Sequence, residues 1–290
     1  MTTPRADTFA ARSATSGLAV MGPLELALRA ELDRIFTSWA RAVDAAPMAY
    51  QTLLPVADLA MLDYWDNFPH LALVATAVRE ESFSQLTAAS AAGFSAGLLA
   101  EAQYALPSAA CYAAYLDLRN TTVPAKHLVT TVATCFRREQ RFEGLRRLLS
   151  FSMREVICVG EREATLDHLS AFKAKIMAFA KRLELPLEIE VASDPFFDAS
   201  ASRSLVAQLF PVKEEFVFRS AEHPEGLAIA SVNFHRNFFG ERCRILTEDG
   251  APAFSSCVAF GLERWLSAVC AQFGPPSARL VERVRDASEL

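Results

Sequence analysis

Arginine is concentrated in one short stretch of this chain, between Phe136 and Arg154. The stretch holds six arginines, at positions 137, 138, 141, 146, 147 and 154, against only Glu139 and Glu143. The whole chain has a formal net charge of −5, which argues against a nucleic-acid-binding face because such domains are usually basic. A concentrated positive field in an acidic protein favours a phosphate pocket. The alternative is a solvated hairpin whose charges pair with one another.

A second arginine follows a glycine at the start of a predicted helix, in the sequence Phe260-Gly261-Leu262-Glu263-Arg264. The start of a helix favours anions because its first N–H groups are unpaired and the helix dipole is positive there. Taken alone, Arg264 fits an ordinary surface arginine equally well. Together with the arginine-rich stretch more than a hundred residues earlier, it suits a polyphosphate ligand.

The six cysteines, at 111, 135, 158, 243, 257 and 270, lie far apart and form no CxxC pair. This pattern is unlike a small secreted disulfide scaffold, so a reducing compartment, the cytoplasm, is expected. Scattered cysteines are usually buried thiols, and their spacing alone gives no local metal motif. The longest apolar run, near 86–100, is interrupted by Ser and is too short to span a bilayer, so no membrane segment is expected.

The size and patterning of the chain indicate one α+β domain. Its 290 residues, 52% of them hydrophobic, are enough for one large core. Residues 1–22 are expected to be a flexible terminus, and 23–290 a single domain with a helical part up to about residue 100. Apolar periodicity predicts helices at 24–45, 80–100, 166–183, 201–210 and 262–273. Short alternating runs predict strands at 127–136, 155–159, 187–191, 214–218, 227–235, 243–246 and 253–260.

The arginine-rich stretch resembles motif 2 of the class II aminoacyl-tRNA synthetases, and the segment 260–264 resembles their motif 3. The motif 2 resemblance rests on Phe136-Arg137-Arg138-Glu139, then Gly144-Leu145-Arg146-Arg147, Phe151 and Glu155, a spacing similar to that of seryl-tRNA synthetases. Asn67-Phe68-Pro69-His70-Leu71 is a weaker match to motif 1, the dimer-forming segment. The resemblance implies a class II synthetase-like catalytic domain, with a mostly antiparallel sheet flanked by helices, in a homodimer.

Other segments are similar to the amino acid:[carrier protein] ligases, which are truncated, zinc-dependent homologues of seryl-tRNA synthetases. These segments are Asp194-Pro195-Phe196-Phe197, Lys213, Ser231-Val232-Asn233-Phe234-His235 and Phe239-Gly240. The resemblance covers most of 55–273, where no coiled-coil arm for gripping tRNA is found, so no tRNA is expected. It implies an enzyme that activates a small amino acid, glycine or alanine, with ATP and passes it to the phosphopantetheine thiol of a carrier protein.

The same resemblance implies the site residues. Zinc would be held by Cys111, Glu155 and Cys257, a set that leaves a fourth position open for the amino group of the substrate. The amino acid would meet Arg137, Glu155, Asp194 and Asn233, and the acidic carrier would dock on the helix at 201–210, which also fits a plain packing helix. ATP with Mg²⁺ would meet Arg137, Glu139, Arg147, Leu148, Phe151, Lys213, Ser231, Val232, Asn233 and Arg264, with Arg137 and Arg264 catalytic.

The chain departs from the synthetase pattern upstream of Asn233. Synthetases have a carboxylate there that helps to bind magnesium and ATP, whereas this chain has Leu227-Ala228-Ile229-Ala230. Two alternatives therefore stand beside the carrier-protein ligase. One is a tRNA-charging enzyme of the seryl type. The other is a synthetase paralogue that binds a nucleotide or partner without turnover.

Overall fold

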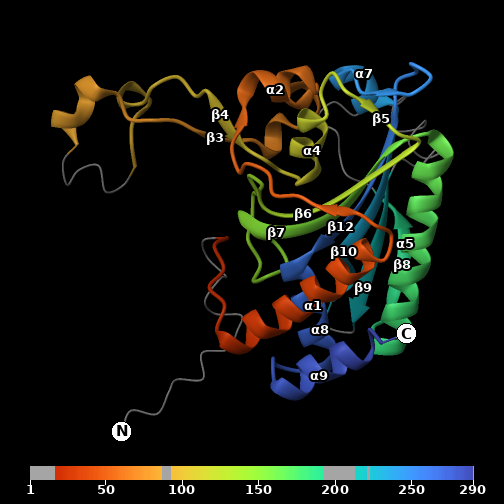
Figure 1. The fold of residues 1–290 in the computed structure, drawn as a ribbon. Helices are drawn as coiled ribbons and strands as arrows, with labels where there is room; N and C mark the ends of the chain where they lie inside the picture. Colours follow the sequence, from red (N-terminus) through yellow and green to blue (C-terminus); the bar gives the residue numbers. More distant parts are fainter. Residues whose placement is uncertain (1–16, 87–92, 193–212, 221–222, 290) are drawn as a thin grey trace, which may run out of the picture.

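The computed structural model describes residues 17–86, 93–192, 213–220 and 223–289. Within these ranges the chain forms one mixed sheet of seven strands with helices on both faces (Figure 1). Asp194 and the predicted docking helix at 201–210 lie outside the described residues.

The central sheet is almost entirely antiparallel. Only the edge strand β1 runs parallel to its neighbour, β6, and the four central strands pair antiparallel throughout. The predicted mostly antiparallel sheet is therefore confirmed. In sheet order the strands are β1 (Ala46–Pro47), β6 (Lys126–Phe136), β7 (Ser150–Gly160), β12 (Phe254–Gly261), β10 (His223–Arg236), β9 (Lys213–Ser220) and β8 (Leu187–Val191).

One face of this sheet is covered by long amphipathic helices. Because side chains alternate along a strand, Val156, Val258 and Phe260 all point to this face. They join the largest buried cluster, where the rings of Phe36 and Phe260 stack with their centroids 4.1 Å apart. The helices that contribute to the cluster are α1 (Pro23–Arg41), α5 (Arg162–Leu183), α8 (Leu262–Phe273) and α9 (Ala278–Asp286).

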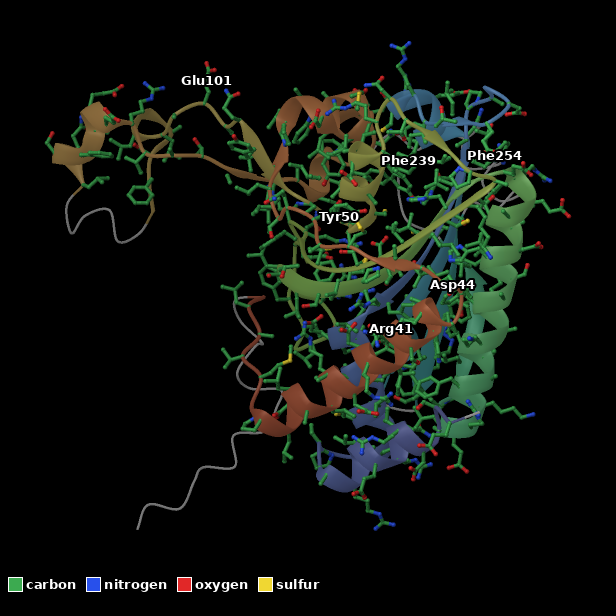
Figure 2. All side chains as sticks on the ribbon, in the orientation of Figure 1. Arg41, Asp44, Tyr50, Glu101, Phe239 and Phe254 are labelled. Atoms are coloured by element: carbon green, nitrogen blue, oxygen red, sulfur yellow. The ribbon has the colours of Figure 1, made fainter. Side chains whose placement is uncertain are left out.

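The opposite face is only partly covered. Two short helices, α4 (Cys111–Asp117) and α7 (Phe238–Cys243), pack on it, with Tyr115 and Phe239 stacked at a centroid distance of 3.9 Å. Phe239 lies in this layer in Figure 2. Beside it lies a small parallel pair formed by β5 (Thr122–Val123) and β11 (Leu246–Thr247). The rest of the face is left open for the site.

A further segment projects from the body, with Glu101 between its base and its outer end (Figure 2). Its base is a three-stranded sheet of β2 (Leu54–Pro55), β3 (Leu73–Ala75) and β4 (Tyr104–Leu106). Near the base are α2 (Val56–Met61), α3 (Tyr64–Asn67) and the 3₁₀ turn η1 (Pro69–Leu71), and further out are the 3₁₀ segments η2 (Glu80–Gln85) and η4 (Ala96–Leu98).

The predicted helix at 80–100 is therefore wrong for its described part. Helices in proteins are stabilised mainly by burying an apolar face. Here Phe83, Leu86 and Phe94 are exposed, so this segment has no core surface on which a helix could pack.

Some of the other predicted helices and strands agree with the structure and others do not. The predicted strand at 187–191 and the helix at 262–273 match β8 and α8. The predicted strand at 243–246 is wrong, because Cys243 ends α7 and Arg244 takes a left-handed conformation (φ 55°) that breaks the chain direction. The short helices α2, α3, α4, α7 and α9 were not predicted. None of the helices in the described ranges is long and apolar enough to cross a membrane.

Candidate functional site

Alternate residues of three central strands place polar side chains on the open face of the sheet. In the ladders, Ala259 of β12 pairs with both Glu155 of β7 and Ser231 of β10, and Cys257 pairs with Asn233. Paired residues of antiparallel strands point to the same face. The side chains of Glu155, Cys257, Ser231 and Asn233 therefore belong to one continuous surface.

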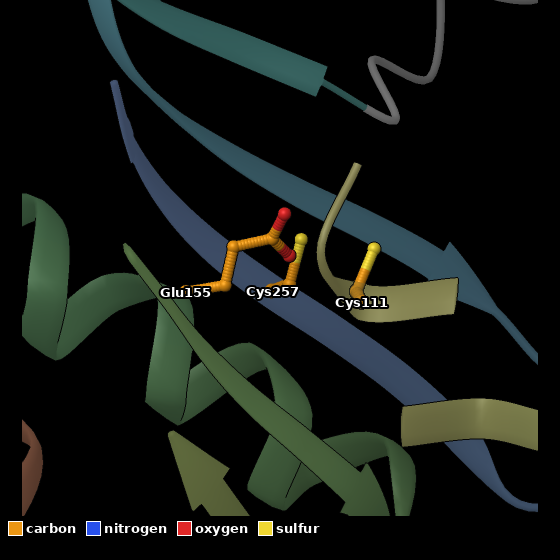
Figure 3. A group of neighbouring side chains, drawn as sticks. All are labelled: Cys111, Glu155 and Cys257. Atoms are coloured by element: carbon orange, nitrogen blue, oxygen red, sulfur yellow. The ribbon is translucent and has the colours of Figure 1, made fainter. Parts of the chain in front are cut away.

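Two thiols and a carboxylate converge at one end of this surface. Cys111 is the first residue of α4, and its Sγ lies with Cys257 Sγ and a Glu155 carboxylate oxygen in a group whose atoms are all within 4.8 Å of one another (Figure 3). All three residues are buried. Glu155 Oε1 accepts a hydrogen bond from the Ala110 amide at 2.9 Å, whereas the buried Oε2 has no hydrogen-bond partner among the described residues.

The electrostatics of the trio favour a bound cation. Burial raises the pKa of Glu155, and the hydrogen bond to Cys257 together with burial raises the pKa of Cys111 well above that of an ordinary thiol. Three ionised groups packed together without a cation would repel one another in a medium of low dielectric constant. Two thiolates and one carboxylate are a donor set that suits tetrahedral zinc, and three protein ligands leave one position open.

A pocket adjoins the trio along the same strands. Its walls come from the loop between β6 and β7, from β7, β9, β10 and β12, and from the start of α8. It is lined by Arg137, Glu139, Leu145, Arg146, Leu148, Phe151, Met153, Lys213, Glu215, Ala228, Ile229, Ala230, Ser231, Ala259, Gly261, Glu263 and Arg264.

Arg137 and Arg264 are two cations of the pocket that main-chain carbonyl groups hold in place. Arg137 Nε donates to the Ser108 carbonyl at 3.1 Å, and its guanidinium lies 5.1 Å from the centroid of the Phe151 ring. Arg264 donates through Nε to the Arg146 carbonyl at 2.9 Å and through Nη1 to the Ala228 carbonyl at 3.0 Å. Burial lowers the pKa of Arg264 to about 10, so it stays charged at neutral pH. These main-chain contacts hold both guanidinium groups before any ligand arrives.

Most of the residues predicted for ATP lie in this pocket: Arg137, Glu139, Leu148, Phe151, Lys213, Ser231 and Arg264. Three are placed differently. Arg147 pairs with Glu139 (2.7 Å), and it is its neighbour Arg146 that lines the pocket. Asn233 lies beside the thiols, with its Nδ2 3.4 Å from Cys257 Sγ.

Val232 is the clearest correction. Its side chain is buried in the main core, because alternation along β10 turns it to the face opposite Ser231 and Asn233. The side chain of Val232 therefore contributes packing rather than a contact in the pocket.

Glu215 is a pocket residue that was not predicted. It pairs with Ser231 across the β9–β10 ladder. Its Oε1 forms an ion pair with Lys213 Nζ at 2.8 Å. The only sequence signal was the spacing of two between Lys213 and Glu215 on one predicted strand. The carboxylate faces the pocket beside the region 227–230, where β10 itself has none.

Solved structures with this architecture are known. The *M. kandleri* SerRS in its complex with *A. aeolicus* tRNASec matches with a TM-score of 0.77 at 19% identity, over 93% of this chain and 57% of that one. The serine-tRNA ligase of *Naegleria fowleri*, solved with AMP, matches with a TM-score of 0.69 at 11% identity, over 92% of this chain and 54% of that one. The fold is that of a class II aminoacyl-tRNA synthetase catalytic domain. Identities this low establish the fold alone.

Curated relatives confirm the resemblance seen in the sequence. The chain is 35% identical over 193 residues to amino acid--[acyl-carrier-protein] ligase 1 of *Bradyrhizobium diazoefficiens* and 37% identical over 197 residues to ligase 2 of that organism, 65% of this chain in each case. It is also 27% identical over 139 residues to the type-2 serine--tRNA ligase of *Methanocaldococcus jannaschii*, 45% of this chain and 26% of that protein. The chain spans 58% and 57% of the length of the two carrier-protein ligases. No family model matches it.

Proposed function

We propose that this class II synthetase-like protein is an ATP-dependent ligase that activates a small amino acid and loads it onto a carrier protein. The observation that supports this most strongly is the continuity of the site. A metal-ligand trio and an arginine-lined pocket lie side by side on the same strands, so an amino acid and a nucleotide would meet at their boundary.

The pocket residues suit a bent ATP with Mg²⁺. Phe151 and Leu148 offer apolar surface to the purine, and Glu139 an acceptor for its amino group. Arg264, at the first turn of α8, and Lys213 would pair with the terminal phosphates. Magnesium would bind between the phosphates and a carboxylate of the pocket, for which Glu215 is available.

The trio suits the amino acid. Cys111, Glu155 and Cys257 would hold zinc, which when bound would take the neutral α-amine in its open position. Asn233 lies at the same end of the surface, beside Cys257. Glycine or alanine is the substrate expected for such a site, with Asp194 as a further residue proposed to contact it.

Arg137 lies between the two parts of the site. It is close enough to Glu155 and to Arg264 to shift the pKa of each. There it would neutralise the charge that develops as the amino-acid carboxylate attacks the α-phosphate of ATP and pyrophosphate leaves. The attacking carboxylate is already ionised, so this step needs no general base.

In the second step the phosphopantetheine thiol of the carrier would attack the carbonyl of the aminoacyl-adenylate. A thioester forms, AMP leaves, and the thiol proton passes to solvent or to the released phosphate. The names of the two *Bradyrhizobium* relatives support the carrier protein as acceptor. A homodimer and a cytoplasmic location remain predictions from the sequence, as does docking of the carrier on 201–210.

The experiment that tests this function is a pyrophosphate-exchange screen over the twenty amino acids, followed by transfer assays. We expect exchange with glycine or alanine and loading of a phosphopantetheinylated carrier, but not of total tRNA. Loading of tRNA with serine would instead support the second candidate, a seryl-type synthetase. The similarity to type-2 serine--tRNA ligases favours this candidate. No exchange with any amino acid in zinc-loaded protein would contradict both and favour a non-catalytic paralogue.

A further inference from the structure

Cys257 lies next to a buried histidine that the proposed reaction does not use. His235 Nε2 is 4.0 Å from Cys257 Sγ, on the side of the sulfur where β10 passes. The other ring nitrogen, Nδ1, is 3.2 Å from the Tyr115 hydroxyl and 3.4 Å from the Ser255 hydroxyl. A chain of polar contacts therefore runs from Tyr115 through the imidazole to the thiol.

The neighbours of the two ring nitrogens together favour a proton on Nε2, because hydroxyl groups can donate to or accept from Nδ1, whereas a thiolate beside Nε2 can only accept. Two hydroxyl groups converge on Nδ1, and each of them can donate a hydrogen bond to it. A neutral imidazole that accepts at Nδ1 must carry its hydrogen at Nε2. That N–H then points towards the sulfur of Cys257.

A second N–H donor reaches the same sulfur. Asn233 Nδ2 is 3.4 Å from Cys257 Sγ and is positioned by a further contact of 3.2 Å with the Ser231 hydroxyl. Two N–H groups around one sulfur can both donate to its lone pairs and so fix its direction. Groups of this kind, which contact a ligand rather than the metal, commonly set the affinity of a metal site.

We propose that His235, with its tautomer set by Tyr115, is a positioning residue that orients the Cys257 thiolate for metal binding. This inference rests on the zinc site of the proposed function, but it concerns residues that neither contact the metal nor take part in the reaction. The metal site then consists of the three ligands and of the two N–H donors, from His235 and Asn233, that contact Cys257.

The packing around His235 allows the hydrogen bond to be separated from the shape of the ring. His235 lies edge-on to Phe239 (centroids 5.0 Å apart, interplanar angle 79°) and to Tyr115 (5.7 Å, 77°). His235→Phe keeps an aromatic ring in this stack and removes the N–H. His235→Gln can return an N–H donor near the position of Nε2. Tyr115→Phe removes only the hydroxyl that faces Nδ1.

The test is the affinity for Zn²⁺, measured by competition with a chromophoric chelator, in the absence of ATP and amino acid. The Co²⁺ protein supplies a second readout, its thiolate-to-metal absorption band. We expect His235→Phe to weaken zinc binding roughly 10- to 100-fold and to shift the cobalt band, since loss of such partners has this effect in other sites. His235→Gln should recover much of the affinity, and Tyr115→Phe should fall between wild type and His235→Phe.

The matched control is His168→Leu, which alters a buried histidine that is hydrogen-bonded to Ser256 on the other face of the sheet. Its zinc affinity should equal that of wild type. Equal zinc affinity and an unchanged cobalt band in His235→Phe and Tyr115→Phe would overturn the inference while leaving the zinc site standing. Wild-type protein that binds no zinc would instead contradict the proposed function itself.

Discussion

Glu155 and Cys257 lie diagonally across the β7–β12 ladder, two positions apart in register. Ala259 pairs with Glu155 and Cys257 pairs with Ile157, so both side chains point to the open face. A slip of one residue in either strand would turn one of them into the core. The register of two strands separated by about a hundred residues of chain therefore fixes the ligand geometry, and Cys111 completes it from the start of α4.

Replacing Arg137 by Lys should reduce catalysis without removing the metal. A lysine keeps the charge but lacks the planar group that can bridge two anions and that contacts Phe151. We expect kcat/KM for pyrophosphate exchange to fall roughly 100- to 1,000-fold, as when a fixed transition-state donor is lost. Zinc content should be unchanged. An activity within a factor of about three of wild type would mean that no such bridge is made.

Replacing Glu215 by Gln should change the magnesium dependence of exchange. The Glu215 carboxylate lies in the pocket beside the region 227–230, where it could bind magnesium. It also forms an ion pair with Lys213 at 2.8 Å. We expect the Mg²⁺ concentration for half-maximal exchange to rise severalfold, and direct binding of Mn²⁺ with ATP, followed by electron paramagnetic resonance, to weaken in parallel. The control is Glu214→Gln, because Glu214 pairs with Lys173 of α5. Coincident magnesium curves for Glu215→Gln and wild type would contradict this role.

Stability should depend on pH through His168. Burial lowers the pKa of His168 from 6.5 to about 3, so the unfolded chain binds this proton more readily than the folded one. The contribution is therefore fully present above pH 6.5 and is lost as pH falls towards 3. The shift corresponds to about 5 kcal/mol over that window.

In His168→Leu, the free energy of unfolding should fall less steeply between pH 6.5 and 4 than in wild type. Ser256 keeps its hydrogen bond to the Thr165 carbonyl at 3.1 Å in this variant, so its neutral-pH stability should remain measurable. Urea titrations at a series of pH values give the comparison. Parallel curves for the two proteins would show that His168 does not titrate on unfolding.

Truncation of Phe36 should destabilise the whole domain. Its side chain is fully buried and stacks on Phe260, linking α1 to the central strand of the sheet. We expect Phe36→Ala to cost about 3 to 5 kcal/mol of unfolding free energy in urea denaturation. Phe83→Ala, at a residue 57% exposed on the projecting segment, is the control and should cost no more than about 0.5 kcal/mol. Similar losses in both variants would place the core elsewhere.

The sequence predicted best those features that local pattern determines. The alternation at 187–191 and the apolar period at 262–273 depend on neighbouring residues, and both elements were found where predicted. The helix predicted at 80–100 was wrong because a helix there would need a surface on which to bury its apolar side. Phe83 and Phe94 are exposed and have no such surface. The strand predicted at 243–246 was wrong because Cys243 ends a short helix, and Arg244 takes a left-handed conformation directly after it.

Within the site, the residues that could not be predicted are those brought together by contacts between segments far apart in the sequence. Arg137 and Arg264 could be predicted because their chemistry and spacing match a known family. Glu215 could not, because only the β9–β10 register places it opposite Ser231. Tyr115 and His235 meet at 3.2 Å although they are 120 residues apart. Val232 was assigned to the nucleotide as part of a continuous segment, whereas alternation along β10 gives its side chain to the core.

In the proposed function, amino-acid activation depends on zinc bound by Cys111, Glu155 and Cys257. Zinc content and amino-acid-dependent pyrophosphate exchange are measured on the same preparations of wild type, Cys257→Ser and Cys270→Ser, the last at a thiol on α8 that packs against the main core cluster and is not part of the trio. We predict one zinc per chain and full exchange in wild type and Cys270→Ser, and loss of both in Cys257→Ser. Exchange that persists in a zinc-free Cys257→Ser protein would show that amino-acid activation does not depend on zinc at this site.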